Sequence, residues 1–221
     1  GLPRGARGGP ARVTAVILAA GVGKRLLQAS GGRPKCLIEL GGKSLLARLL
    51  EALAAAGVAE AAVVTGFGAE AVRAAIGDGP PNLRVRWVVN PRYREGAILS
   101  LWAARDALAG PVIVMDADVL CGPDMIARLV RSPHENCFLL DASVARTGEE
   151  QMLLVRGGLV RNIVRGGAPG YEHEGESVGF LKLSAAAARL LATLLGRRVA
   201  AGGSGIEHGE GYPALLGSRV G

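Results

Sequence analysis

Aromatic residues are scarce in this sequence. They make up 4% of its 221 residues, although 49% of the residues are hydrophobic. A core with so few rings must consist mainly of leucine, valine, isoleucine and alanine, as in helices packed on a buried sheet. A chain of this length folds most simply as one domain that buries about 70% of the surface its unfolded form exposes. The composition therefore favours the α/β class.

Cysteine is also rare, and its three occurrences at Cys36, Cys121 and Cys137 do not form a C-x-x-C pair. This pattern indicates neither a disulfide framework nor a zinc site, and it predicts a cytoplasmic location. Residues 1–10 have no apolar core, so they predict neither a signal peptide nor a membrane span. We expect a disordered extension over 1–10 and a single domain over 11–221, with a truncated or incomplete C-terminal end as one option.

A concentrated block of positive charge is missing too. The formal net charge of +7 comes mainly from scattered arginines without interleaved aromatics, so it does not predict a nucleic-acid partner. A small anionic substrate explains the charge equally well, and so does compositional drift. We expect no nucleic-acid and no membrane partner. The oligomeric state stays open, with a homodimer as one option.

Hydrophobic periodicity predicts alternating strands and helices. Strands are expected at 13–18, 61–65, 85–89 and 112–115, and helices from Ser44 to Gly57, at 69–76 and at 97–108. A helix at 125–131 is followed by short strands at 137–140, 152–155, 159–164 and 177–183, then by a helix at 185–195, and 202–221 reads as loop. This order predicts a Rossmann-like, doubly wound, mainly parallel sheet with a small β-hairpin insertion that turns at Gly157-Gly158.

Glycines and basic residues follow the first expected strand. The segment reads Leu18-Ala-Ala-Gly-Val-Gly-Lys-Arg25, and Pro34-Lys35 comes shortly after it. Backbone N–H groups beside glycines can approach phosphate oxygens, while Lys24, Arg25 and Lys35 can neutralise them, so the segment predicts a triphosphate site. A P-loop would need glycine at 18, and a dinucleotide fingerprint would need glycine at 26, so both motifs are excluded.

Two carboxylates end the strand expected at 112–115. Asp116 and Asp118 would lie at the carboxyl edge of a parallel sheet, where ligands of such folds bind and where the loop after residue 18 also arrives. Carboxylates beside a polyphosphate suit Mg²⁺, with Asp118 as the main ligand and Asp116 as a second ligand or an orienting group. An Asp pair that merely starts a turn is the structural alternative.

These segments resemble the pyrophosphorylase-type nucleotidyltransferases, with L-A-A-G-x-G-x-R followed by P-K. The stretch Asn90-Pro-Arg-Tyr-Arg-Glu-Gly-Ala-Ile-Leu-Ser100, the Asp-Ala-Asp118 motif and Gly175-Glu-Ser-Val-Gly-Phe180 are similar to the cytidylyltransferase branch, which contains phosphocholine, inositol-1-phosphate and phosphonate cytidylyltransferases. The resemblance implies a CTP-dependent enzyme with Mg²⁺ on Asp118. It implies nucleotide contacts from Leu18, Ala19, Ala20, Gly21, Gly23, Lys24, Arg25, Asn90 and Ser100.

The acceptor of the CMP group is expected to be a small phosphate or phosphonate. Lys35 would bridge this acceptor and the α-phosphate, and with Arg25 and Asp118 it forms the predicted catalytic set. Tyr93, Tyr171 and Glu176 are the further acceptor candidates. The aromatic and acidic residues at 171–176 favour a cationic head, as in phosphocholine or 2-aminoethylphosphonate, over inositol-1-phosphate.

Two departures from the branch keep alternatives open. Gly96-Ala97 stands where relatives carry an amide, and no acidic segment like theirs precedes Gly221 to supply a second metal carboxylate. Asp116, Glu176, Glu207 or Glu210 could substitute. The alternatives are a sugar-1-phosphate nucleotidyltransferase with another NTP, a catalytically silent nucleotide-binding domain and, from charge alone, a nucleic-acid-binding module.

Overall fold

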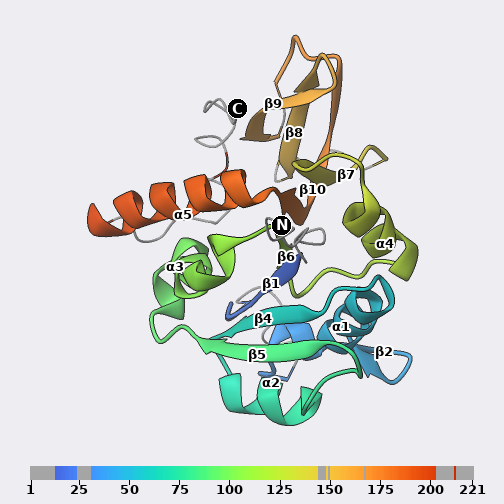
Figure 1. Cartoon of the computed structure of the whole chain (residues 1–221), viewed down its shortest axis with the longest axis vertical. Helices are drawn as coiled ribbons and strands as arrows, with labels where there is room; N and C mark the ends of the chain where they lie inside the picture. The colour runs from blue at the N-terminus through green and yellow to red at the C-terminus, as the bar shows by residue number, and fades with distance from the viewer. Residues whose placement is uncertain are drawn as a thin grey trace, which may run out of the picture.

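The computed structural model describes residues 13–23, 31–143, 148, 150–166, 168–202 and 212 (Figure 1). Its parallel strands are β1 (Thr14–Ala19), β4 (Glu60–Thr65), β5 (Arg84–Val89) and β6 (Val112–Asp116). They lie side by side in the order β5-β4-β1-β6. Each of these strands falls within one or two residues of its predicted position, and the apolar runs of β1, β4 and β6 are those of strands covered on both faces.

Antiparallel strands complete the sheet beyond β6. They are β7 (Cys137–Asp141), β8 (Gln151–Arg156), β9 (Leu159–Arg165) and β10 (His173–Leu183). The order continues β6-β10-β8-β9, and β7 pairs with β10. The turn between β8 and β9 is Gly157-Gly158 as predicted, with φ of 61° and 70°. The β8–β9 hairpin rises above the helices at the top of Figure 1.

Helices cover both faces of the sheet. On one face α1 (Leu45–Ala55), α2 (Ala69–Ile76) and α4 (Pro123–Arg131) pack against a core that includes Ile17 and Met115. On the other face α3 (Ala97–Ala103) and α5 (Ala185–Ala200) pack against the alternate strand residues. Figure 1 shows α3 and α5 on one side and α1 and α4 on the other. The predicted α/β class and doubly wound, Rossmann-like fold are confirmed, with the antiparallel strands as the second part of the sheet.

Helix α1 shows how the sequence directs this packing. The Ser44 hydroxyl accepts a hydrogen bond from the backbone N–H of Ala47 at 3.2 Å, so the helix begins where an N-cap was predicted. Its leucines recur at helical spacing and are at most 2% exposed at 46, 49, 50 and 53. Gly57 has φ of 88°, and the helix ends just before it.

Two local features differ from the prediction. The helix expected at 97–108 divides at Ala104 into α3 and the 3-10 helix η3 (Arg105–Ala109), because the Ala104 N–H bonds three residues back to Leu101 at 3.1 Å. A small hairpin of β2 (Glu39–Leu40) and β3 (Lys43–Ser44) was not predicted. It turns at Gly41-Gly42, which have φ of 58° and 74°.

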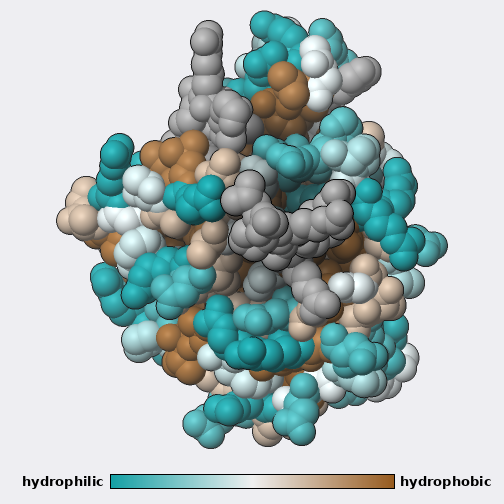
Figure 2. Space-filling model, viewed as in Figure 1, coloured by the Kyte–Doolittle hydropathy of each residue, from teal (hydrophilic) through white to brown (hydrophobic). Residues whose placement is uncertain are grey.

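The surface drawn in Figure 2 is mainly hydrophilic, with hydrophobic residues in small separate patches. None of the helices in the described part of the chain has the length and apolar character needed to cross a bilayer. Residues 1–10 and all of 203–221 except Tyr212 lie outside the described residues, so the extension and the terminal loop stay predictions.

Candidate functional site

The carboxyl ends of β1, β4 and β6 meet at one edge of the sheet. Leu18 pairs with Asp116, and Ala19 pairs with Thr65. Backbone hydrogen bonds continue just beyond the strands, from Phe67 N to Ala20 O at 3.1 Å and from Ala117 N to Leu18 O at 3.2 Å. The loops at 20–23, 66–68 and 117–118 therefore start from one rigid base. The predicted nucleotide residues Leu18, Ala19, Ala20 and Gly21 lie on it.

Lys35 and Asp118 face each other at this edge. The Lys35 Nζ lies 3.3 Å from the Asp118 Oδ2, with the side chains 29% and 41% exposed. A pair this exposed contributes no more than about 1 kcal/mol to stability, since water screens it. A phosphate can therefore replace Asp118 as the partner of Lys35, and a metal ion can replace Lys35 as the partner of Asp118, at little cost in free energy. The structure brings together a cation and a carboxylate that are 83 residues apart.

Gly23 makes this approach of Lys35 possible. A Cβ built on Gly23 would lie 2.5 Å from both Cγ and Cε of Lys35, and the φ of Gly23 is +63°. A side chain at this position would therefore collide with the lysine stem and strain the backbone. The glycine loop, Lys35 and Asp118 form one group, as the sequence predicted.

The loop after β4 packs against two other predicted segments. A Cβ on Gly68 would lie 2.6 Å from Cγ of Pro34, and a Cβ on Gly66 would lie 2.5 Å from Cβ of Tyr93. Pro34 immediately precedes Lys35 at the start of the 3-10 helix η1 (Lys35–Leu37). The Gly66-Phe-Gly68 loop therefore supports both Lys35 and Tyr93. Sequence reasoning missed this role, although two glycines beside one aromatic residue directly after a strand could have indicated it.

Asn90 and Ser100 bind each other in the interior. The Asn90 Nδ2 donates to the Ser100 Oγ at 3.0 Å, and each residue is 3% exposed. The Asn90 Oδ1 accepts from the Arg92 N–H at 2.9 Å. These bonds hold the loop that carries Tyr93, so the contribution of Asn90 visible here is to loop conformation. Direct contacts of the pair with a nucleotide stay a prediction.

Tyr93 begins the 3-10 helix η2 (Tyr93–Glu95) and lies beside another aromatic residue. Its ring centroid is 6.5 Å from that of Phe67, and the guanidinium of Arg94 lies 5.6 Å from the Tyr93 centroid. The Arg94 Nε also donates to the Tyr93 hydroxyl at 3.3 Å. The two rings place an aromatic cluster at the same edge of the sheet as Lys35.

The carboxylates of Asp116 and Asp118 influence different neighbouring side chains. Strand alternation places Asp116 on the α3 and α5 face, and its charge, after burial, is the second cause that raises the pKa of the Tyr212 hydroxyl. On the other side, burial and then the charge of Asp118 raise the pKa of the Cys36 thiol to about 12. Cys36 therefore stays protonated and is not a nucleophile.

The donor chemistry of Asp116 and Asp118 fits Mg²⁺, which prefers oxygen ligands. Within the described residues there is no cluster of three or more histidine, cysteine or acidic side chains that could hold a metal. Mg²⁺ is commonly bound through one or two carboxylates, with substrate phosphates and waters as the other ligands. The two aspartates suit such a site.

The acidic stretch before Phe180 does not act as one unit. The Arg156 guanidinium lies 5.1 Å from the Tyr171 ring centroid, and the Glu172 carboxylate accepts from the Gly157 N–H at 2.7 Å. Both contacts join this stretch to the β8–β9 turn. At about 3.3 Å per strand residue, Glu176 lies no more than roughly 10 Å from Gly179, whereas Tyr171 precedes β10 and contacts Arg156 at the end of β8. By position, Glu176 is the nearer acceptor candidate.

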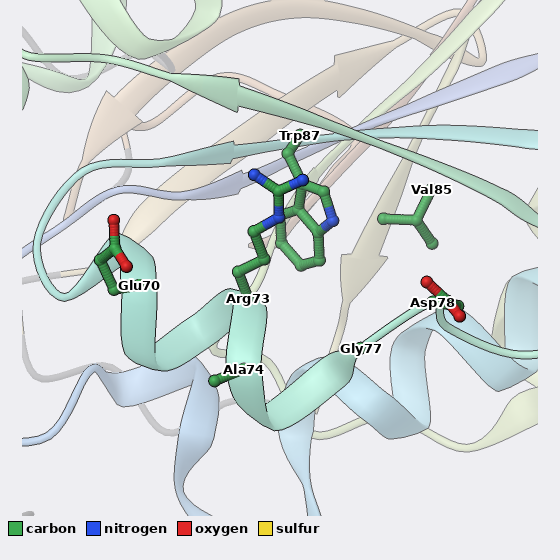
Figure 3. Close-up of a pocket in the computed structure, with 7 residues that line it drawn as sticks. All are labelled: Glu70, Arg73, Ala74, Gly77, Asp78, Val85 and Trp87. Atoms are coloured by element: carbon green, nitrogen blue, oxygen red, sulfur yellow. The ribbon is translucent and has the colours of Figure 1, made fainter.

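Lys24 and Arg25 lie outside the described residues, so their predicted phosphate contacts remain predictions. A cavity of about 510 Å³ lies elsewhere, between α2 and β5 (Figure 3). Figure 3 shows the Arg73 side chain beside the Trp87 ring, with Glu70 and Asp78 at opposite ends. None of the residues lining this cavity belongs to the predicted site.

Comparison with known sequences gives one family match and several relatives. The model of the MobA-like NTP transferase domain matches residues 15–202. The CMP-5'-(3-aminopropyl)phosphonate synthase of Streptomyces rubellomurinus is 38% identical over 122 residues, which are 55% of this chain and 19% of that protein. The 2-aminoethylphosphonate cytidylyltransferase of Lancefieldella rimae is 29% identical over 186 residues, which are 83% and 72% of the two chains.

A solved structure shows the same fold. The UDP-glucose pyrophosphorylase complexed with UDP-glucose matches with a TM-score of 0.74 at 14% identity, covering 93% of this chain and 87% of that one. At 14% identity this structural match supports the fold alone. Of the curated relatives, the Streptomyces protein is much longer, and the chain spans only about a fifth of its length.

Proposed function

Because this chain belongs to the MobA-like NTP transferase domain family, we propose that it is a cytidylyltransferase that transfers CMP from CTP to a small phosphate- or phosphonate-bearing alcohol or amine. Pyrophosphate is the second product. Family membership confirms the nucleotidyltransferase superfamily that residues 18–25 and 34–35 predicted. The observation that carries the proposal is the Lys35–Asp118 pair, held over Gly23 at the carboxyl edge of the parallel strands.

The reaction needs no protein nucleophile. An anionic oxygen of the acceptor attacks the α-phosphorus of CTP, a P–O bond forms, and the bond to the departing pyrophosphate breaks. The enzyme must hold two mutually repelling anions in line and stabilise the charge that develops. Lys35 leaves Asp118 and bridges the acceptor phosphate and the α-phosphate, while Lys24 and Arg25 stabilise the leaving pyrophosphate.

Asp118 and Asp116 would hold Mg²⁺ in this scheme. The ion, when bound, neutralises nucleotide oxygens. The aspartates contribute orientation, because Asp116 ends the buried strand β6 and Asp118 follows it in the next turn. A strand end moves less than a loop tip, so the carboxylates keep their positions when the substrates bind.

The acceptor is proposed to carry a cationic head. The two curated relatives described above are named for aminoalkylphosphonates, and Glu176 is an acidic residue on β10, three residues before Gly179. Tyr93 adds an aromatic ring at the same edge. 2-Aminoethylphosphonate and its longer homologue are therefore favoured, followed by phosphocholine and then inositol-1-phosphate.

The direct test is a product assay. The protein is incubated with CTP, Mg²⁺ and a mixture of 2-aminoethylphosphonate, phosphocholine and inositol-1-phosphate, and cytidine conjugates are identified by mass. We expect a CMP conjugate of the phosphonate together with pyrophosphate, and no conjugate with the Lys35→Ala variant. CTP binding without turnover on any acceptor would instead support a silent nucleotide-binding domain.

A second assay separates the base specificities. Pyrophosphate release is measured with CTP, UTP, dTTP and GTP in the presence of sugar-1-phosphates and of the phosphonate. Faster turnover of a sugar-1-phosphate with UTP, dTTP or GTP would favour the sugar nucleotidyltransferase alternative. The absence of nucleic-acid and membrane partners, a homodimer and a cytoplasmic location stay predictions.

A further inference from the structure

Gly179 lies in β10 opposite the end of β6, where the strand pairing is irregular. Phe180 pairs with Met115 on β6 in antiparallel register, so the preceding residue, Gly179, lies at the Asp116 end of that strand. On the other side of β10, the pairing with β7 shifts between Ser177 and Phe180. Gly179 has a φ of +79°, and its N–H donates to the Ser177 Oγ at 3.2 Å. The chain thus forms a bulge that a residue with a side chain rarely adopts.

The space beside Gly179 is filled by Asp116. A Cβ built on Gly179 would lie 3.0 Å from Cγ and 3.3 Å from Cβ of Asp116, and its nearest neighbour would be Oδ2. The Cβ atom of a real side chain does not approach another heavy atom to less than 3.0 Å. Any substitution would therefore rotate the carboxylate of Asp116 or move β10 away from β6.

Both constraints act on a carboxylate of the candidate site. Bulges are frequent beside active sites, where they redirect a side chain. Here the bulge brings the Gly179 backbone against the Asp116 carboxylate, and the absence of a side chain on Gly179 leaves space for that carboxylate. A regular β10 residue with a side chain would satisfy neither the backbone conformation nor the available space.

We propose that Gly179 is a positioning residue: its missing side chain and left-handed conformation hold the Asp116 carboxylate in its place at the carboxyl edge of β6. The inference rests on the proposed function, in which Asp116 is a metal ligand. It assigns the orientation of this ligand to a residue in the antiparallel part of the sheet. Gly179 acts through Asp116 and touches no substrate.

The test compares Gly179→Ala with a matched control, Gly158→Ala. Gly158 has a φ of +70°, so alanine is strained there too, but nothing lies within 4 Å of its added Cβ. Mn²⁺ binding in the presence of CTP is measured by electron paramagnetic resonance. We expect Gly179→Ala to weaken Mn²⁺ binding about tenfold or more, as when a group that orients a ligand is disturbed, and Gly158→Ala to leave it unchanged.

A double-mutant cycle decides whether Gly179 acts through Asp116. In the Asp116→Ala background the nearest colliding atoms are gone, so Gly179→Ala should cause no further loss of Mn²⁺ affinity and a smaller drop in the urea midpoint than in the wild type. Equal losses in both backgrounds overturn the proposal. So does a folded Gly179→Ala with normal Mn²⁺ affinity if Asp116→Ala itself weakens binding.

The outcomes separate this inference from the proposed function. If the wild type makes no cytidine conjugate, or if Asp116→Ala leaves Mn²⁺ binding unchanged, the proposed function or the metal role of Asp116 fails. The urea midpoints still decide the positioning role of Gly179. If Gly179→Ala does not fold, the double variant must regain stability, and its failure to do so overturns the proposal.

Discussion

The inner parallel strands and the outer strands of the sheet differ in how deeply they are buried. In β4 and β6 every residue except one at an end is buried, whereas no residue of β5, β7 or β9 is buried. The inner parallel strands are covered by helices on both faces, and β5 and β9 lie at the two ends of the strand order. In the antiparallel part only β8 is buried over its four central residues, so this part is more solvated than the parallel strands that carry the site.

This difference indicates that the two parts of the sheet have different roles at the site. The groups that would handle the nucleotide, Lys35 and Asp118, are supported by the parallel part. The antiparallel part brings Gly179 against Asp116 at the same edge, and Glu176 lies three residues earlier on β10. Phosphate chemistry needs precise geometry, which a buried scaffold provides, while acceptor recognition tolerates variation. Substitutions in the two parts should therefore affect different quantities.

The largest effect is expected at the site base. Lys35→Ala and Asp118→Ala should each lower kcat by about 10²–10³, because each removes a preorganised group that stabilises developing charge. The measurement is pyrophosphate release at saturating CTP. Lys43→Ala is the control, since this exposed lysine pairs with Glu51 at 2.7 Å on the surface. Near-normal turnover of either site variant would remove the assigned role.

Core truncation should separate the two parts by stability. Leu50 in α1 is completely buried, and its replacement by alanine should lower the free energy of unfolding by about 2–5 kcal/mol. Leu159 in β9 is 56% exposed, and Leu159→Ala should change it by less than about 0.5 kcal/mol. Urea denaturation of the two variants gives both values. Equal losses would mean that β9 is as tightly packed as the parallel part.

Acceptor binding should respond to the antiparallel part. Glu176→Gln removes a carboxylate and should raise KM for an aminoalkylphosphonate about tenfold, as expected for the loss of one charge-assisted hydrogen bond, with kcat little changed. Tyr171→Ala should leave KM unchanged, because that ring faces Arg156 at the hairpin turn. The KM for CTP is the internal control. A larger effect of Tyr171→Ala would reverse the order of these two candidates.

A pH dependence of stability is expected from Cys36, which is buried beside the site. The Cys36 pKa is raised from 9.0 to about 12, chiefly by burial. Above pH 9.0 the unfolded thiol loses its proton while the folded thiol keeps it, so this contribution to stability falls as pH rises between those two values. Urea midpoints measured across this window should decline less steeply for Cys36→Ala. Identical slopes would show that Cys36 does not contribute.

Much of the parallel part could be predicted from local pattern. The N-cap Ser44 and the leucine spacing after it specify α1, and apolar runs mark β4 and β6. The division of the predicted helix at Ala104 and the hairpin at Gly41-Gly42 were missed. In both cases the outcome depends on short hydrogen-bonded turns, which hydrophobic periodicity does not register.

Alternation of apolar and turn residues, read along the chain alone, determined the fold class, the strand order along the sequence and the identity of the glycine loop and the aspartate pair. Only the folded chain decided which of these groups meet. Lys35 reaches Asp118 because Gly23 leaves room for the lysine side chain. Asp116 lies against Gly179, which is 63 residues further along the chain. Contacts of this kind depend on the space between distant segments, and one-dimensional patterns carry no information about that space.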